Sequence, residues 1–339
     1  MLSGLNNNKP KIIVLTPVKN EAWILDRFLQ VSSLFADHII IADQKSTDGS
    51  ENIYLKYSKV IVVKNDNNSF NESERQLILI NQAREKFGIN NILLALDADE
   101  ILAANALKTK DWNKMLSAKP GTILYFEKPT LYKDISTVIR YNGEGWPLGY
   151  VDDGAPHTPT AIHSTRVPTP DYACKLHLNE IKFLHYNLLR LDAQASKYRM
   201  YTMLENIKKT TTLRLRRRAY SSKIDFTNEG DIHEKINLDW LQNWRQLGID
   251  METIKRTKYY WYDYEVLKLF NNYGTYRFAF EDIWEFDWEA FRLKAIEEGY
   301  IFIPNSPITR PLPTFSRAVT MCIDYIDNML LKIKIRRFR

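Results

Sequence analysis

Three acidic residues follow directly on an apolar run in the first third of the chain. The run ILLAL leads into Asp97, Asp99 and Glu100. Carboxylates held close together repel one another and lose water, so they need a compensating positive charge. Mg²⁺ and Mn²⁺ bind carboxylate oxygens and often share them with substrate phosphates. The pattern predicts a divalent metal site at Asp97 and Asp99. The alternative is a solvated turn, because Asp-x-Asp also occurs by chance.

The acidic cluster is positioned by a regular alternation of predicted strands and helices. Short β-branched runs predict strands, and apolar residues at helical spacing predict helices. The strands are expected at 11–16, 38–43, 60–64 and 92–97, and the helices at 21–35 and 71–88. This order predicts an α/β fold with a doubly wound, mostly parallel sheet. Ligands of such sheets bind beyond the carboxyl ends of the strands, so Asp43, Asp97 and the loop at 16–21 should line one crevice.

Three segments of this region share one family resemblance. KIIVLTPVKNEAWIL, IIIADQKSTDGS and ILLALDADE resemble the nucleotide-sugar-binding half of a family 2 glycosyltransferase with the GT-A fold of bacterial type. The matching positions are Thr16, Pro17, Asn20, Glu21, Asp43, Ser46, Asp48, Asp97 and Asp99. Gln44 and Lys45 stand where the family has a second Asp and a Gly. The resemblance covers residues 1–130.

The resemblance implies a metal-dependent, inverting glycosyltransferase that uses Mn²⁺ or Mg²⁺. Its donor would be a nucleoside-diphosphate sugar, and its acceptor a hydroxyl of a glycan or a lipid-linked molecule, in surface polysaccharide or lipopolysaccharide synthesis. Asp43 would hydrogen-bond the base or ribose, and Asp99, helped by Asp97, would hold the metal. The full donor-binding set is Thr16, Pro17, Asn20, Glu21, Asp43, Arg75, Asp97, Lys197 and Arg199. For Arg75 the alternative is an ordinary surface arginine.

A histidine at a further predicted strand end is the third candidate metal ligand. His185 follows the apolar run IKFL in a strand expected at 181–187. A neutral imidazole can bind Mn²⁺ or donate to a phosphate; the alternative is a core histidine. Lys197 and Arg199, on the next predicted helix, would pair with diphosphate oxygens. His163 and Arg166 form a weaker pair in the preceding loop.

An inverting transfer needs a general base that takes the proton of the acceptor hydroxyl. The Glu-Asp acceptor motif of the family is not found at its expected place. Asp152 and Asp153, in GYVDDGAPH, are the best substitutes, because this loop is expected to cap the donor site. Glu180 is the reserve candidate.

The second half of the chain has a less regular pattern. Residues 1–228 are expected to form the glycosyltransferase domain, with 1–130 as its donor half and 131–228 as its acceptor half. Within it, 146–170 reads as a long loop and 190–220 as one long helix. Residues 229–339 are expected to form a helical extension, rich in aromatic residues that mainly serve as core.

The chain ends in a predicted basic amphipathic helix. One helical stripe is apolar, while basic residues gather in the final KIKIRRFR. Such a helix can lie in a membrane interface, which would suit a lipid-linked acceptor. The favoured alternative is docking on its own domain or on a partner subunit.

Composition and charge limit the remaining classes. Two distant cysteines, no secretory h-region and no run of about 18 apolar residues predict a cytoplasmic protein, peripheral at the inner membrane face if the tail binds there. The net charge of +6 and the RLRRR cluster leave open a non-catalytic module that binds nucleic acid or anionic lipid. No specific nucleic acid is expected, because such a module leaves the strand-end acids unexplained. A nucleotidyltransferase is a further alternative, although TPVKNEA lacks the glycines of a phosphate loop.

Overall fold

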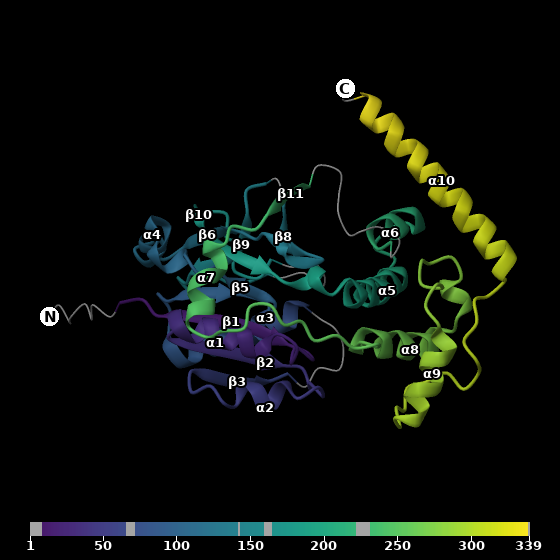
Figure 1. Cartoon of the computed structure of the whole chain (residues 1–339), viewed down its shortest axis with the longest axis horizontal. Coiled ribbons are helices and arrows are strands. Elements are labelled where there is room, and N and C mark those ends of the chain that lie inside the picture. The colour runs from purple at the N-terminus through teal and green to yellow at the C-terminus, as the bar shows by residue number, and fades with distance from the viewer. Residues whose placement is uncertain (1–8, 66–71, 142, 159–164, 222–230, 338–339) are drawn as a thin grey trace. The chain divides into compact units, whose positions relative to one another are not determined.

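The computed structural model describes residues 9–65, 72–141, 143–158, 165–221 and 231–337 (Figure 1). The chain forms two compact units. Unit 1 comprises residues 1–189 and 229–256, and unit 2 comprises 190–228 and 257–339. This corrects the expected boundary at 228, because the described residues 231–256 belong to unit 1. There β11 (Ile232–Lys235) pairs with β8 (Asp134–Arg140), and Trp240, Leu241 and Trp244 join the main core.

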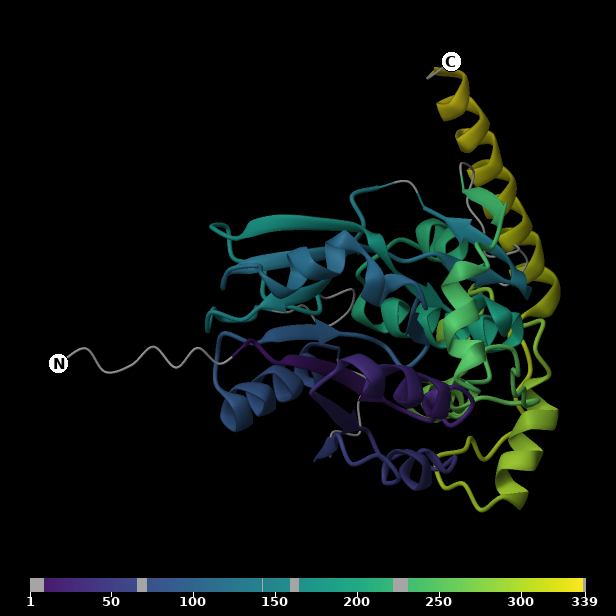
Figure 2. The same cartoon turned by 60° about the vertical axis from the view of Figure 1, so that its left-hand side comes forward.

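Unit 1 is built on one mixed sheet (Figure 2). Its strand order is β11-β8-β7-β10-β6-β9-β4-β1-β2-β3, and β5 pairs with β10 off this path. The remaining bounds are β1 Ile12–Val18, β2 His38–Asp43, β3 Val60–Lys64, β4 Ile92–Ala95, β5 Glu100–Leu102, β6 Thr122–Glu127, β7 Thr130–Tyr132, β9 Trp146–Val151 and β10 Cys174–His185. β4, β1, β2 and β3 are mutually parallel, which confirms the expected fold class.

Helices cover both faces of this sheet, as the strand–helix alternation predicted. The helices of unit 1 are α1 Leu25–Phe35, α2 Ser50–Tyr54, α3 Glu72–Phe87, α4 Lys110–Leu116 and α7 Asp239–Gln246, with short 3₁₀ turns η1 Ala106–Lys108 and η2 Asn187–Leu189. Side chains of α1, α4 and α7 pack with Val14, Ile39 and Leu94 in one core. α3 packs with Ile13 and Leu93 in the other. Alternate residues of the buried strands therefore fill opposite cores.

The middle of unit 1 departs from the expected loop at 146–170. Its first six residues form β9, which lies antiparallel between β4 and β6. Gly149 permits this close packing, since a Cβ there would lie 2.9 Å from a Leu94 side-chain atom and 3.0 Å from one of Leu124. β7 and β8 form a tight hairpin that turns at Lys133, whose φ is 62°.

Unit 2 is helical and aromatic. It contains α5 Leu191–Lys208, α6 Leu213–Ala219, α8 Trp261–Tyr273, η3 Tyr276–Phe278, α9 Trp288–Glu297 and α10 Pro313–Arg337. The single helix expected at 190–220 is broken at Lys209, which adopts a left-handed φ of 55° before three consecutive threonines. Phe270, Phe278 and Trp288 pack edge to face in its core, where the sequence predicted that the aromatic residues would lie.

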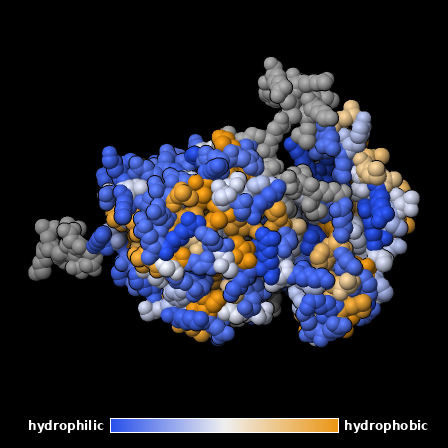
Figure 3. Space-filling model, viewed as in Figure 1, coloured by the Kyte–Doolittle hydropathy of each residue, from blue (hydrophilic) through white to orange (hydrophobic). Residues whose placement is uncertain are grey.

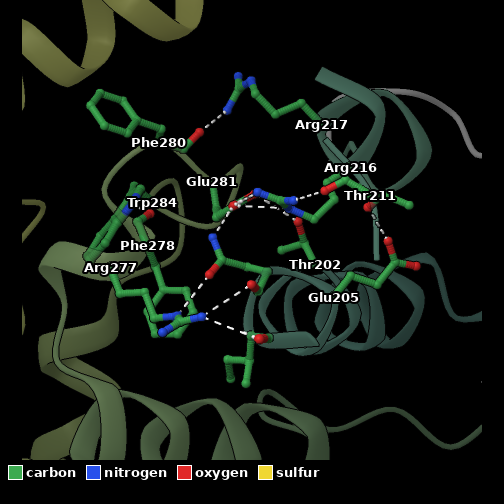
Figure 4. A network of polar contacts seen from close by, with 12 residues as sticks. Thr202, Glu205, Thr211, Arg216, Arg217, Arg277, Phe278, Phe280, Glu281 and Trp284 are labelled. Atoms are coloured by element: carbon green, nitrogen blue, oxygen red, sulfur yellow. Dashed lines mark hydrogen bonds and ion pairs between the residues drawn. The ribbon is translucent and has the colours of Figure 1, made fainter. Parts of the chain in front are cut away.

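The basic cluster RLRRR lies on α6 and is largely paired inside unit 2. Arg216 donates to the buried carboxylate of Glu281, which also accepts from Thr202 and Asn206 (Figure 4). Arg217 forms a bidentate pair with Asp324 of α10. These pairs assign the cluster to internal structure, which weighs against a nucleic-acid-binding face.

Candidate functional site

The carboxyl ends of three parallel strands bring the predicted donor-site residues to one edge of the sheet. Val18 of β1 pairs with Asp43 of β2, and the backbone amide of Leu96 donates to the carbonyl of Leu15. Because β1, β2 and β4 run in the same direction, Asp43 and Asp97 follow strands that end at the same edge. This is the arrangement that the sequence pattern predicted.

Hydrogen bonds tie the loop after β1 to the loop after β2. Asn20 has a φ of 56°, and its amide N–H donates to Ser46 Oγ over 2.9 Å. The amide of Thr47 donates in return to Asn20 Oδ1 over 2.7 Å. The amide of Glu21 donates to Ser50 Oγ. The predicted contact residues Asn20 and Glu21 thus belong to one rigid, two-loop wall.

The residues just before this loop are less accessible. Thr16 is fully buried within β1, and Pro17 occupies a paired position of the same strand, opposite Ala42. A side chain that is fully buried in the sheet lacks exposed surface for a ligand. Thr16 therefore supports the loop from within the sheet, whereas Pro17 is partly exposed at the edge where the loop begins.

The carboxylate of Asp43 is held by two hydroxyl donors. Ser46 Oγ donates to Asp43 Oδ1 over 2.5 Å, and the hydroxyl of Tyr54 donates to Oδ2 over 3.1 Å. Burial and the adjacent Asp43 charge raise the pKa of Tyr54, so this hydroxyl keeps its proton. Asp43 is therefore an oriented acceptor that can bind N–H or hydroxyl groups of a ligand.

The acidic cluster after β4 is neutralised by two cations from distant parts of unit 1. Arg166 contacts Asp97 Oδ2 and Glu100 Oε2, each over 2.5 Å. Lys128 Nζ donates to Glu100 Oε1 over 2.9 Å. Although burial opposes its ionisation, Arg166 and Lys128 lower the pKa of Glu100, which is fully buried. Glu100 is thus an anchor for two cations, whereas Asp97 is partly exposed.

Asp99 faces the predicted third ligand. His185 Nε2 lies 3.6 Å from Asp99 Oδ2, and both side chains are partly exposed. Antiparallel pairing of His185 with Glu100, and a hydrogen bond from the Tyr186 amide to the Asp99 carbonyl, fix this approach. The structure therefore brings together Asp97, Asp99 and His185 at the end of the sheet.

The donor set of this cluster suits a shared divalent cation. No group of three or more His, Cys, Asp or Glu side chains is arranged to hold a metal ion among the residues that the structure describes. Mg²⁺ is usually bound through one or two carboxylates together with substrate phosphates, without a complete protein cage. Two adjacent groups, the Asp99 carboxylate and the His185 imidazole, fit that mode of binding.

Two cations of this cluster were missed or underrated by the sequence reasoning. Lys128 was not considered, and Arg166 was expected only as a weak partner of His163, which lies outside the described residues. The signal was electrostatic: three carboxylates at the end of a buried strand need nearby cations when no ligand is bound. The sequence does not indicate which of its 47 lysines and arginines supply them.

The two predicted catalytic carboxylates require a correction of position. β9 runs antiparallel to β4, so Asp152 and Asp153 lie at the amino end of β4. The amide of Asp152 donates to the carbonyl of Asn91, six residues before Asp97 and roughly 20 Å away in extended chain. Asp152 is buried in a bidentate pair with Arg84. Asp153 accepts from Tyr150 and Tyr172. Neither carboxylate lies at the edge where the general base would be needed.

The reserve candidate, Glu180, is also engaged away from the acidic cluster. Its carboxylate accepts from the amide of Asp111, and its own amide donates to Asp111 Oδ2. These reciprocal bonds join β10 to the start of α4. Glu180 therefore has a clear structural role, and nothing places it near Asp97.

The remaining predicted cations have different placements. Arg75 lies in the first turn of α3, near the amino end of this helix, and its side chain is half-buried. Lys197 and Arg199 belong to α5 of unit 2, where Arg199 forms a buried pair with Asp263 over 2.7 Å. The Arg199 guanidinium also lies 4.1 Å from the Phe286 ring centroid. Arg75 therefore remains a candidate donor contact, while Arg199 is engaged in an ion pair inside unit 2.

Comparisons with known proteins assign the first part of unit 1. Residues 13–109 match the model of the family described as Glycosyl transferase family 2, which confirms the resemblance found in the sequence. A search among curated proteins gave no match.

Two synthases are among the solved structures that match this chain. Glucosyl-3-phosphoglycerate synthase from Mycobacterium tuberculosis, in complex with Mn²⁺, uridine diphosphate and glucosyl-3-phosphoglycerate, has 20% identity and a TM-score of 0.25. The match covers 35% of this chain and 44% of that one, so this chain spans less than half of that synthase. A 4-diphosphocytidyl-2C-methyl-D-erythritol synthase has 16% identity and a TM-score of 0.28, covering 43% of this chain and 71% of that one.

Proposed function

We propose that this chain, whose residues 13–109 are a glycosyl transferase family 2 domain, transfers a sugar from a nucleoside-diphosphate sugar to a hydroxyl acceptor, with inversion. The observation that carries the proposal is the meeting of Asp43, Asp97, Asp99 and His185 at the carboxyl ends of β2, β4 and β10. Nucleotide ligands of α/β sheets bind at such edges.

In this proposal each residue has a role that its surroundings support. Asp43, oriented by Ser46 and Tyr54, accepts hydrogen bonds from the base or ribose of the donor. Asp99 and His185 hold Mn²⁺ or Mg²⁺, and Asp97 assists. A bound cation would neutralise the diphosphate as it leaves. The acceptor oxygen bonds to the anomeric carbon as its proton passes to water, and the bond between that carbon and the diphosphate breaks, with its electron pair leaving on the diphosphate.

A nucleotide and metal panel tests the donor site. Thermal unfolding is measured with UDP, GDP, CDP or dTDP, each with and without Mn²⁺. A ligand at one hundred times its dissociation constant adds about 2.7 kcal/mol to the free energy of unfolding, which raises the melting temperature measurably. We expect one nucleotide to stabilise the protein only when metal is present. If none of the four nucleotides raises the melting temperature at millimolar concentration with Mn²⁺ present, the proposal is contradicted.

The alternatives that the sequence left open are less well supported. A nucleic-acid-binding module would use RLRRR, but Arg214, Arg216 and Arg217 form ion pairs within unit 2. A nucleotidyltransferase would need a glycine-rich phosphate loop after the first strand, and the loop after β1 contains Lys19, Asn20 and Glu21 instead.

We also propose that α10 binds an anionic membrane surface, where a lipid-linked acceptor would be presented. The helix buries its polar stripe: Ser316, Thr320 and Asp327 are buried, and Asp324 and Asp327 pair with arginines of α6. The exposed apolar side chains are Phe315, Met321, Tyr325, Ile326, Met329 and Leu330. Hydrophobic surface is visible along α10 in Figure 3. No helix of the described residues is long and apolar enough to cross a bilayer.

This geometry favours an interface over internal docking. An amphipathic helix that docks on its own protein buries its apolar stripe, whereas α10 presents that stripe to the outside. The last eight residues, KIKIRRFR, add five basic side chains and no acidic one. Exposed apolar side chains combined with basic residues are typical of helices that lie on anionic lipid.

Vesicle binding measures this property. We expect the full chain to sediment with vesicles that contain phosphatidylglycerol and not with phosphatidylcholine vesicles. The triple variant Met321→Ser, Tyr325→Ser, Met329→Ser should bind about tenfold more weakly, because three apolar side chains no longer enter the interface. The matched control is Leu293→Ser with Ile296→Ser, two exposed apolar residues of α9. Unchanged vesicle binding by the triple variant would contradict the assignment. So would a wild-type protein that forms dimers but does not bind vesicles, if the triple variant no longer dimerises.

A further inference from the structure

A cavity of about 400 Å³ opens beside the acidic cluster in unit 1. It is lined by Glu127, Lys128, Pro129, Arg140, Tyr141, Gly143, Gly145, Trp146 and Asn179. β9 is antiparallel to both β4 and β6, so β6 runs in the same direction as β4. Glu127 at the end of β6 and Trp146 at the start of β9 therefore share the sheet edge with Asp97. The cavity lies at the edge where the donor site is proposed.

One lysine joins the cavity to the acidic cluster. Lys128 Nζ donates to Glu100 Oε1 over 2.9 Å and lies 4.3 Å from the centroid of the Trp146 ring. Glu100 in turn shares Arg166 with Asp97. A ligand on Trp146 would consequently lie within two side chains of the residues proposed to bind the donor diphosphate. Transfer between two substrates requires this adjacency.

The lining combines one exposed aromatic ring with several polar groups. Trp146 is 44% exposed, although tryptophan is usually well buried. Around it, Arg140 pairs with Glu127 over 2.9 Å, and Lys182 pairs with the same carboxylate over 3.0 Å. Asn179 adds an amide. The faces of a sugar ring carry C–H groups and its rim carries hydroxyls, so it suits an aromatic face with fixed donors and acceptors around it. A lipid chain would need an apolar lining.

The wall of the cavity is shaped by a glycine. Gly145 has a φ of 86°, and a Cβ there would lie 2.8 Å from the carbonyl oxygen of Phe126. Only glycine lets this backbone lie against β6 just before Trp146. The backbone position of Trp146 is therefore set by packing against β6.

We infer that this cavity is the acceptor subsite and that it binds a saccharide, with a sugar ring against Trp146 and hydroxyls at Glu127, Arg140 and Asn179. The inference rests on the proposed glycosyltransferase function, and it narrows the acceptor from any hydroxyl compound to a glycan. A lipid-linked acceptor would then be recognised here through its sugar.

Saturation-transfer NMR tests saccharide binding without any donor. The full chain is mixed with methyl glycosides and short oligosaccharides of glucose, galactose, mannose and N-acetylglucosamine. We expect ring-proton signals for at least one saccharide with the wild-type protein and with Trp146→Phe, and loss of these signals with Trp146→Ala. The matched control is Tyr276→Ala, an exposed aromatic of unit 2. Trp146 is partly exposed, so its truncation should leave the fold intact, which circular dichroism would verify.

Kinetics of the same variants separate this inference from the proposed function. With the stabilising nucleotide identified, Trp146→Ala should keep the metal-dependent nucleotide shift and raise the KM for the saccharide by about tenfold or more. Absence of saccharide signals with the wild-type protein, or equal signals and equal KM in Trp146→Ala, would overturn the subsite. Failure of the nucleotide shift alone would instead count against the donor site.

Discussion

Replacing Asp99 with Asn is expected to abolish sugar transfer while the protein stays folded. The amide keeps the shape of the side chain but removes the charge that would hold a cation beside His185. Loss of the electrostatic stabilisation supplied by such a metal is worth about 4 kcal/mol, so kcat should fall by about 10³-fold. The measurement is release of nucleoside diphosphate from the donor that wild type uses, with Mn²⁺ at saturation.

Two further variants make this result specific. Asp171→Asn removes a carboxylate from an exposed turn and should leave the rate unchanged. Asp153→Asn changes a carboxylate at the amino end of β4 and should retain transfer, because that end of the strand faces away from the acidic cluster. Wild-type turnover in Asp99→Asn would remove the metal site from the mechanism. Loss of turnover in Asp153→Asn, with the fold intact, would return this residue to the catalytic set.

Replacing Glu281 with Ala is expected to produce the largest loss of stability among single changes in unit 2. Its carboxylate accepts two hydrogen bonds from Arg216, one from Thr202 and one from Asn206. Removing it leaves the Arg216 cation buried without this partner, which costs about 3–5 kcal/mol. Urea unfolding followed by tryptophan fluorescence measures the change, since Trp284 and Trp288 lie in the same unit.

The control for Glu281 is a glutamate without a buried environment. Glu297→Ala, at the exposed end of α9, should alter the free energy of unfolding by less than about 0.5 kcal/mol. A similar, small effect of both substitutions would show that the Arg216 network contributes little to stability. In that case the basic cluster on α6 would again be open to a binding role.

Elements made from strong local patterns were predicted well. β2 and β3 have the bounds that the β-branched runs HIIIAD and VIVVK indicated, and α3 differs from its predicted range by one residue at each end. The edge that unites Asp43 and Asp97 was also predictable. Parallel strands place their carboxyl ends together whatever the rest of the chain does.

Features that depend on distant parts of the chain were not predictable. Glycine and proline made WPLGYV resemble a loop, yet it is paired on both sides because β4 and β6 supply partners. The antiparallel pairing of β9 with β4 places Asp152 and Asp153 at the amino end of β4. Likewise, Arg166 pairs with Asp97 only through a tertiary contact between residues that are 69 positions apart. Sequence separation of about 70 residues hides such contacts from pattern reasoning.

The discontinuous course of unit 1 has a consequence for the order of events during synthesis. The ribosome releases residues 1–189 first, but Trp244, which donates to the carbonyl of Leu102, emerges only after the excursion into unit 2. During synthesis, the core between the sheet and α1 therefore lacks the side chains of α7 until about residue 256 has been made. A fragment that ends at residue 228 would lack β11 and α7 and would leave this core partly exposed to water.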